Sequence, residues 1–111
     1  MTILEVETVE DGGLVKLVLR GELDLSTVAK VEEELRRAEA AEPPVLVLDL
    51  AGLTFLDSTG LRLIVTADQR ARDQRRRLTV VKGPDTVQRV FSITRLDERL
   101  EMVEPGTDPV G

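Results

Sequence analysis

The run Val45–Leu50 does most to constrain the fold, because valine and leucine fill it without the alternation of a half-exposed strand. Such a run is typical of a strand buried on both faces of a sheet. Soon afterwards a helix is indicated by apolar residues at helical spacing, namely Leu61, Ile64, Val65 and Ala71. Between the strand and the helix lies Asp57-Ser58-Thr59-Gly60, here called the elbow. We expect the functional residues of the chain at this elbow.

The composition excludes most catalytic and metal sites. A chain of 111 residues has the length of one domain and can bury a conventional core. It contains neither cysteine nor histidine. Disulfides, thiol nucleophiles and thiolate metal sites are therefore excluded, and the commonest general base and zinc ligand is missing. We expect a protein that is not an enzyme and that uses no metal and no cofactor.

The charge balance argues against nucleic acid as a partner. Fifteen Lys and Arg residues stand against 21 Asp and Glu residues, a net charge of −6, and Phe55 and Phe91 are the two aromatic residues. Nucleic acid is usually held by basic grooves and aromatic stacking platforms. No apolar stretch approaches the roughly 20 residues of a membrane span, and the N-terminus lacks the pattern of a signal peptide. We expect a cytoplasmic domain that binds neither nucleic acid nor a membrane.

The first third of the chain predicts a β-hairpin followed by a helix. Ile3–Val9 alternates, Leu14–Arg20 is more apolar, and Glu10-Asp11-Gly12-Gly13 between them is a tight-turn signal. The helix that follows has a stripe formed by Val28, Val31, Leu35 and Ala38. Its N-cap is expected to be Asp24 or Ser26.

The rest of the chain alternates strands and helices. The expected elements are a loop over Ala51–Leu56, a helix over Ser58–Arg75, a strand over Leu78–Lys82, a helix starting at Gly83-Pro84-Asp85, a turn over Leu96–Leu100 and an edge strand over Leu100–Val103. The buried stripe of the third helix is expected to contain Val87, Val90, Phe91 and Ile93. We expect a solvated face for the basic residues at the end of the second helix, Arg72, Arg75, Arg76 and Arg77.

This order predicts an α/β fold. Strands that alternate with helices imply right-handed crossovers and a mixed, largely parallel sheet of four to five strands. The N-terminal β-hairpin would supply the antiparallel strand, and the helices would pack on the sheet. No internal repeat and no linker divides the chain.

Two interpretations of the elbow remain open. Asp57 or Ser58 can cap the second helix, which is the usual role of such residues at a helix start. However, Ser58 and Thr59 provide two adjacent hydroxyls, and a helix cap needs only one of them. Gly60 costs about 1 kcal/mol of helix propensity relative to alanine, which indicates a close approach to the backbone. The elbow matches neither a nucleophile elbow nor a P-loop, but ligands do bind at the carboxyl ends of strands in such sheets.

Two segments resemble the anti-sigma factor antagonists, which are single STAS-domain proteins. They are Gly21-Glu22-Leu23-Asp24 with Thr27, and Leu53-Thr54-Phe55-Leu56-Asp57-Ser58-Thr59-Gly60-Leu61. A weaker similarity runs over Val87–Leu100. The resemblance covers nearly the whole chain and implies a STAS-like fold over residues 1–104. The composition of residues 105–111 indicates a flexible C-terminal tail.

The resemblance also implies a protein-interaction switch. Ser58 occupies the position of the serine that the anti-sigma factor, an ATP-dependent serine kinase, phosphorylates. The unphosphorylated antagonist binds the anti-sigma factor and frees the sigma factor, whereas the phosphorylated antagonist lets go. A metal-dependent serine phosphatase then removes the phosphoryl group and restores the binding form. The implied partner-binding residues are Asp24, Thr27, Asp57, Ser58, Thr59, Gly60 and Leu61.

Some positions depart from the family pattern or have two interpretations. Thr59 stands where many members have a second serine, so it is a secondary candidate acceptor. Gln74-Arg75-Arg76-Arg77 lacks the glycine that usually ends the second helix, and the chain ends where many members add an amphipathic helix. Asp24 is either a cap or a partner contact, and Phe55 is either core or a partly exposed anchor.

An alternative function is that of a STAS regulatory or scaffold subunit in another complex, either a lipid-transport ATPase complex or a stressosome. Nothing in the sequence demands more than a monomer.

Overall fold

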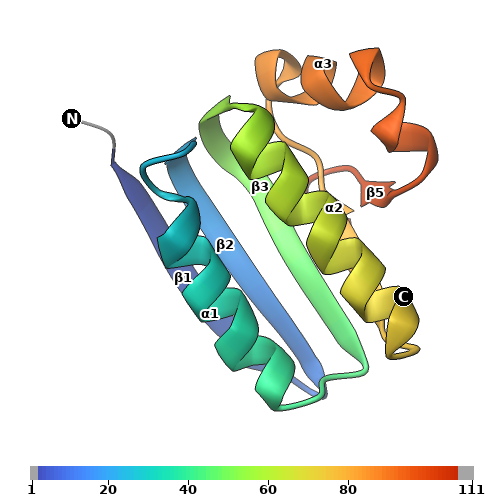
Figure 1. Cartoon of the computed structure of the whole chain (residues 1–111). Coiled ribbons are helices and arrows are strands. Elements are labelled where there is room, and N and C mark those ends of the chain that lie inside the picture. Colours follow the sequence, from blue (N-terminus) through green and yellow to red (C-terminus); the bar gives the residue numbers. More distant parts are fainter. Residues whose placement is uncertain (1–2, 108–111) are drawn as a thin grey trace.

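The computed structural model describes residues 3–107 and contains one five-stranded sheet (Figure 1). Its strands are β1 (Leu4–Asp11), β2 (Leu14–Leu23), β3 (Val45–Leu56), β4 (Arg77–Val81) and β5 (Glu101–Val103). Its helices are α1 (Val28–Ala40), α2 (Ser58–Asp73), α3 (Asp85–Ile93) and the short 3₁₀ helix η1 (Leu96–Glu98). The expected tail over residues 105–111 lies mostly outside the described residues.

The sheet confirms the predicted α/β fold. The strands lie in chain order, β1 pairs antiparallel with β2, and the other neighbours are parallel. Because right-handed crossovers between successive neighbours all fall on the same side, α1, α2 and α3 cover one face of the sheet (Figure 1). Alternate residues of β2, including Val15, Leu17 and Leu19, point into the single core beneath the helices.

Strand β3 is longer than the sequence predicts. The segment Ala51–Leu56, expected as a loop, continues the strand and pairs with the end of β2. The pairing shifts register between Val18 and Arg20 and again between Gly21 and Glu22. Such bulges accommodate glycine and polar residues in a strand. The prediction of a loop was therefore wrong, because strand pairing overrode the local composition.

Two expectations about the helices also need correction. Thr27, rather than Asp24 or Ser26, is the N-cap of α1, and it makes no side-chain cap bond. Ile93 is 74% exposed, because α3 turns it away from the core. The buried residues of α2 include Leu63, Ile64 and Ala67, whereas Leu61 and Val65 are half-buried.

The structure at the end of α2 shows how this helix ends without the glycine that is usual there. Arg75 takes the left-handed conformation that glycine usually supplies there, with φ of 56°. The Arg76 N–H donates to the Ala71 carbonyl at 2.7 Å, and the Arg75 N–H donates to the Arg72 carbonyl at 3.1 Å. This Schellman turn sends Arg76 back between the helices, where its Nη1 lies 3.9 Å from Glu39 Oε2. The expectation of a solvated face is therefore wrong for Arg76, which is 8% exposed.

We predict that Arg75→Gly raises the free energy of unfolding by about 0.5–1 kcal/mol, because glycine adopts the left-handed conformation without a Cβ penalty. Urea unfolding followed by circular dichroism measures the change. Arg75→Ala is the matched control, since it removes the same side chain but keeps the strained backbone, and it should bring no such gain. Equal stability of the glycine and alanine variants would contradict the prediction.

Charged side chains hold β5 against β4. Both carboxylate oxygens of Glu101 accept hydrogen bonds of 2.9 Å from Nε of Arg77, and the Thr79 hydroxyl also donates to Glu101. The hydrogen bond from Arg77 lowers the pKa of the Glu101 carboxyl from its ordinary value. A lowered pKa in the folded state stabilises the fold above the ordinary glutamate pKa, and this contribution is lost as the pH falls through the lowered value.

Accordingly, Glu101→Gln should cost stability near neutral pH, and its deficit relative to the wild type should shrink below about pH 4, the usual glutamate range. Urea unfolding at a series of pH values measures both proteins. Glu10→Gln is the control, because Glu10 is exposed and makes no side-chain ion pair within residues 3–107. A deficit that stays constant across the pH series would exclude the Glu101–Arg77 pair as its source.

Candidate functional site

The parallel pairing of β2 and β3 brings two polar segments to one edge of the sheet. Leu23 and Leu56 are register partners at the ends of these strands. Asp24 follows the first and Asp57 follows the second, so the loop Asp24–Thr27 lies beside the elbow. The strand register therefore brings the two aspartates near each other.

Asp57 links these two segments directly. Its Oδ1 accepts a hydrogen bond of 2.9 Å from the Gly60 N–H, which makes Asp57 the N-cap of α2. Its Oδ2 accepts one of 3.1 Å from the Leu25 N–H in the neighbouring loop. The Asp57 N–H donates to the Leu23 carbonyl at 3.2 Å. One carboxylate therefore caps α2 and ties the loop before α1 to it.

The remaining elbow residues differ in exposure. Ser58 is exposed at the first position of α2, Thr59 and Leu61 are half-buried, and Gly60 is buried. Within residues 3–107 the Ser58 hydroxyl has no hydrogen-bond partner, because Asp57 supplies the cap. The extra hydroxyl noted in the sequence is therefore available at the surface.

The structure explains why residue 60 is a glycine. A Cβ there would lie 2.7 Å from Leu23 Cγ and 3.0 Å from the Leu23 carbonyl oxygen. The close approach that the sequence indicates is thus made by the end of β2 and not by a ligand. Gly60 allows α2 to start tight against the strand.

The loop before α1 is held by its own side chains. Asp24 Oδ1 accepts hydrogen bonds from the Ser26 N–H at 2.9 Å and from the Ser26 hydroxyl at 2.7 Å. The buried Thr27 hydroxyl donates to the Glu22 carbonyl at 2.8 Å and accepts from the Asp24 N–H at 3.0 Å. Thr27 therefore shapes the loop from beneath, while Asp24 remains half-buried at its surface.

Two large apolar side chains flank the elbow at the surface. Phe55 is 48% exposed and Leu25 is 75% exposed. Phe55 is thus the partly exposed alternative of the two that the sequence left open. Leu25 was not singled out from the sequence, although an apolar residue between Asp24 and Ser26 in a polar loop was a usable signal.

The site exposes the Ser58 hydroxyl together with the apolar side chains of Leu25 and Phe55. Within residues 3–107, no group of three or more acidic side chains is arranged to hold a metal ion. None of the described helices has the length and apolarity needed to cross a membrane. An exposed hydroxyl at a helix N-terminus, between two aspartates and two apolar side chains, can accept a group and contact a partner.

Replacing the Asp57 side chain should loosen this site. We predict that Asp57→Ala lowers the free energy of unfolding by about 1–2 kcal/mol, because the N–H groups of Gly60 and Leu25 lose their acceptor. Asp57→Asn should cost less, since asparagine is an equally good N-cap. Chemical denaturation measures both variants, and hydrogen exchange should locate the loosening at Leu25 and Gly60. A loss of the same size in both variants would assign the effect to charge rather than to capping.

The chain is similar in sequence to known proteins. The STAS domain family model matches residues 5–106. The anti-sigma-B factor antagonist of Listeria monocytogenes is 33% identical over 88 residues, which is 79% of this chain and 77% of that protein.

Solved structures share the fold. An anti-sigma factor antagonist from Mycobacterium paratuberculosis superposes with a TM-score of 0.86 at 24% identity, over 96% of this chain and 89% of that one. Unphosphorylated SpoIIAA superposes with a TM-score of 0.75 at 22% identity, over 92% of this chain and 87% of that one. Phosphorylated SpoIIAA, from Bacillus, superposes with a TM-score of 0.70 at 21% identity, over 92% of this chain and 90% of that one. The chain belongs to the STAS domain family and, within it, to the anti-sigma factor antagonists.

Proposed function

We propose that this protein binds an anti-sigma factor that is a serine kinase, that its binding releases the sigma factor, and that phosphorylation of Ser58 ends the binding. A metal-dependent serine phosphatase would then restore the binding form. The observation that carries the proposal is the exposed Ser58 hydroxyl at the N-terminus of α2, beside an Asp57 that already caps the helix.

Exposure favours Ser58 over Thr59 as the acceptor. A kinase must bring the hydroxyl to the γ-phosphate of ATP, and Ser58 is exposed whereas Thr59 is half-buried toward α1. Thr59 stays the secondary candidate. The partner surface we propose consists of the accessible residues Asp24, Asp57, Ser58, Thr59 and Leu61, while the buried Thr27 and Gly60 support it from below.

The electrostatics of the site suit a switch. A phosphoryl group adds about −1.5 to −2 charges and three acceptor oxygens. The N-terminus of α2 tolerates this charge, so the fold need not change. The neighbouring Asp57 and Asp24 carboxylates would add to the negative potential that a partner meets. A tenfold loss of affinity needs only about 1.4 kcal/mol, which a phosphate in an interface can supply.

The relatives support the same role. The chain is 33% identical to an anti-sigma-B factor antagonist. SpoIIAA has been solved with and without phosphorylation, and this chain resembles both forms in fold. Because phosphorylated SpoIIAA keeps the STAS fold, it supports a switch in which phosphorylation changes the partner surface and leaves the fold unchanged.

The test is to incubate the purified protein with its anti-sigma factor and ATP and to measure its intact mass. The wild type should gain one phosphoryl group, and Ser58→Ala should gain none. Thr59→Ala is the matched control and should still gain one phosphoryl group, because it keeps the Ser58 hydroxyl. Phosphorylation of Ser58→Ala to the wild-type extent would overturn the assignment of the acceptor.

Binding is measured in the same preparation. The unphosphorylated wild type should form a complex with the anti-sigma factor, and the phosphorylated protein should bind at least tenfold more weakly. A wild type that forms no complex with the anti-sigma factor would overturn the proposed function.

A further inference from the structure

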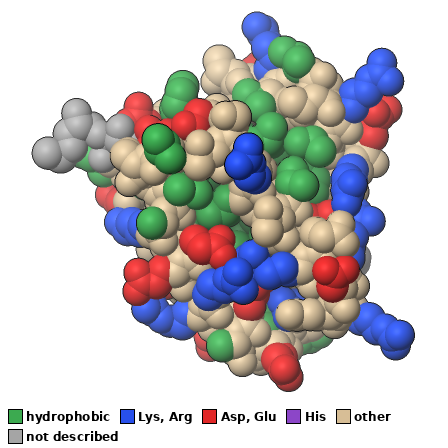
Figure 2. All heavy atoms as spheres, in the orientation of Figure 1, with side chains coloured by type: hydrophobic (Ala, Val, Ile, Leu, Met, Phe, Trp, Pro, Cys, Tyr) green, Lys and Arg blue, Asp and Glu red, His purple; other side chains and the backbone are tan. Residues whose placement is uncertain are grey.

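A groove of about 420 Å³ runs between α1 and α2, starting beside the elbow. Thr59 and Val28 lie at its upper end, Leu63 contributes to its floor, and Arg36 and Arg70 lie at its lower end. From Val28 to Arg36 the groove follows α1 for about 12 Å, or roughly two helical turns at 1.5 Å per residue. Figure 2 shows hydrophobic side chains gathered over this face of α1 and α2 with basic side chains beside them.

The groove is positively charged on an acidic protein. Its lining contains three arginines, Arg36, Arg62 and Arg70, against one acid, Glu32, while the whole chain carries −6. Glu32 is shared, because its Oε1 lies 2.7 Å from Nε of Arg36 and 3.4 Å from Nη2 of Arg70. The excess of guanidinium groups over carboxylates leaves the lining with a net charge of +2, from three cations and one anion.

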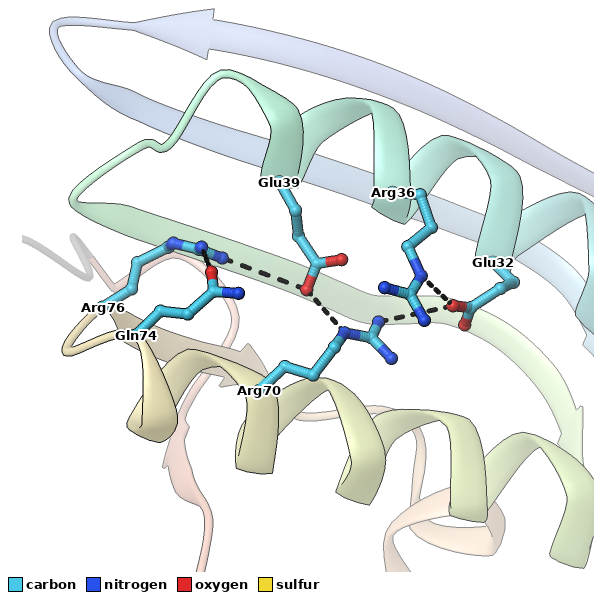
Figure 3. Close-up of polar contacts among 6 residues, drawn as sticks. All are labelled: Glu32, Arg36, Glu39, Arg70, Gln74 and Arg76. Carbon is cyan, nitrogen blue, oxygen red and sulfur yellow. Dashed lines mark hydrogen bonds and ion pairs between the residues drawn. The ribbon is translucent and has the colours of Figure 1, made fainter.

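A chain of ion pairs fixes the lower part of the groove (Figure 3). Nε of Arg70 lies 3.0 Å from Glu39 Oε2, and Glu39 in turn faces Arg76. These contacts join α1 to α2 and hold Arg70 in place at 17% side-chain exposure. Ion pairs therefore position the lower part of the groove, where they hold the Arg70 side chain between the two helices.

Arg62 differs from the other two arginines. Its side chain is exposed and makes no hydrogen bond or ion pair with any residue of the described part of the chain. It lines the groove one helical turn after Ser58. An unpaired guanidinium above an apolar floor is suited to a carboxylate on an incoming apolar segment.

We propose that this groove docks an amphipathic helical segment of the anti-sigma factor, whose apolar face covers Val28 and Leu63 and whose acidic side chains pair with Arg62 and the lower arginines. Helix-in-groove binding of this kind uses apolar anchors spaced over two turns, which is the length available here. The inference rests on the proposed function and adds a second contact area continuous with the elbow through Thr59.

The position of Arg62 connects this groove to the switch. A phosphoryl group on Ser58 would stand four residues before Arg62 on the same helix face, at the spacing of a favourable ion pair. The phosphate would then compete with the acidic side chain of the partner for the same guanidinium. Phosphorylation would thereby weaken the groove contact as well as the contact at the elbow.

The first experiment measures the Kd of unphosphorylated protein for its purified anti-sigma factor by calorimetry. Arg62→Glu should weaken binding at least tenfold, and Arg62→Lys should recover most of it. Arg89→Glu is the matched control, because Arg89 is exposed on α3, lacks a side-chain ion pair within residues 3–107 and gives the same net charge. It should bind like the wild type.

A second experiment identifies the occupant. Because the chain has no cysteine, Ala29→Cys places one photo-crosslinker on the exposed edge of the groove, and Ser92→Cys places a control crosslinker on α3. Mass spectrometry of the crosslinked complex should find, at position 29 only, a segment of the anti-sigma factor with helical apolar spacing and Asp or Glu residues. A basic segment at position 29, or the same segments at both positions, would overturn the inference.

The outcomes separate this inference from the proposed function. If the wild type binds the anti-sigma factor and is phosphorylated on Ser58, but Arg62→Glu binds as well as Arg89→Glu, the groove inference fails and the proposed function stands. If the wild type does not bind the anti-sigma factor at all, both fail. Circular dichroism of Arg62→Glu excludes misfolding as the cause of weaker binding, and little instability is expected because Arg62 has no partner to lose.

Discussion

Parallel pairing of β2 with β3 is the constraint on which the site depends. It aligns Leu23 with Leu56 at the same edge of the sheet, so the two segments that follow these strands meet there. The Asp57 carboxylate then joins them, accepting from Gly60 in one segment and from Leu25 in the other. The pairing also requires Gly60, because a larger residue would collide with the end of β2. These contacts position the elbow, and Ser58 is exposed at its surface without serving as the cap.

Charge is distributed unevenly over this acidic protein. Asp24 and Asp57 lie at the edge of the sheet beside Ser58, whereas arginines gather a short distance away between α1 and α2. Partly buried ion pairs add little net stability in general, but they restrict the relative position of the elements that they join. Glu39 between Arg70 and Arg76 acts in this way, since it links α1, α2 and the turn that follows α2. The same network shapes the groove in which the unpaired Arg62 lies.

Much of the fold could be predicted from local patterns. The hairpin, the three helices and the short final strand follow from apolar spacing and from glycine in the first turn, and the structure confirms each of them. The errors occur where a distant partner overrides a local preference. Ala51–Leu56 became strand because β2 lies beside it, and Arg76 became buried because the turn at Arg75 directs it toward Glu39. Ile93 fits a helical stripe by spacing, yet α3 turns it outward.

For the site, the sequence by itself determined the residue types at the elbow and the absence of histidine and cysteine, because these are matters of composition. It also determined the start of α2 at Ser58, because helix-capping preferences act between near neighbours. Only the tertiary structure decided that Asp57 rather than Ser58 caps the helix, that Gly60 makes room for Leu23, and that Leu25 and Arg62 lie at the surface around Ser58. Those outcomes depend on which strand ends and which helix faces meet. That is set by sheet register and crossover handedness, which act between residues more than thirty positions apart.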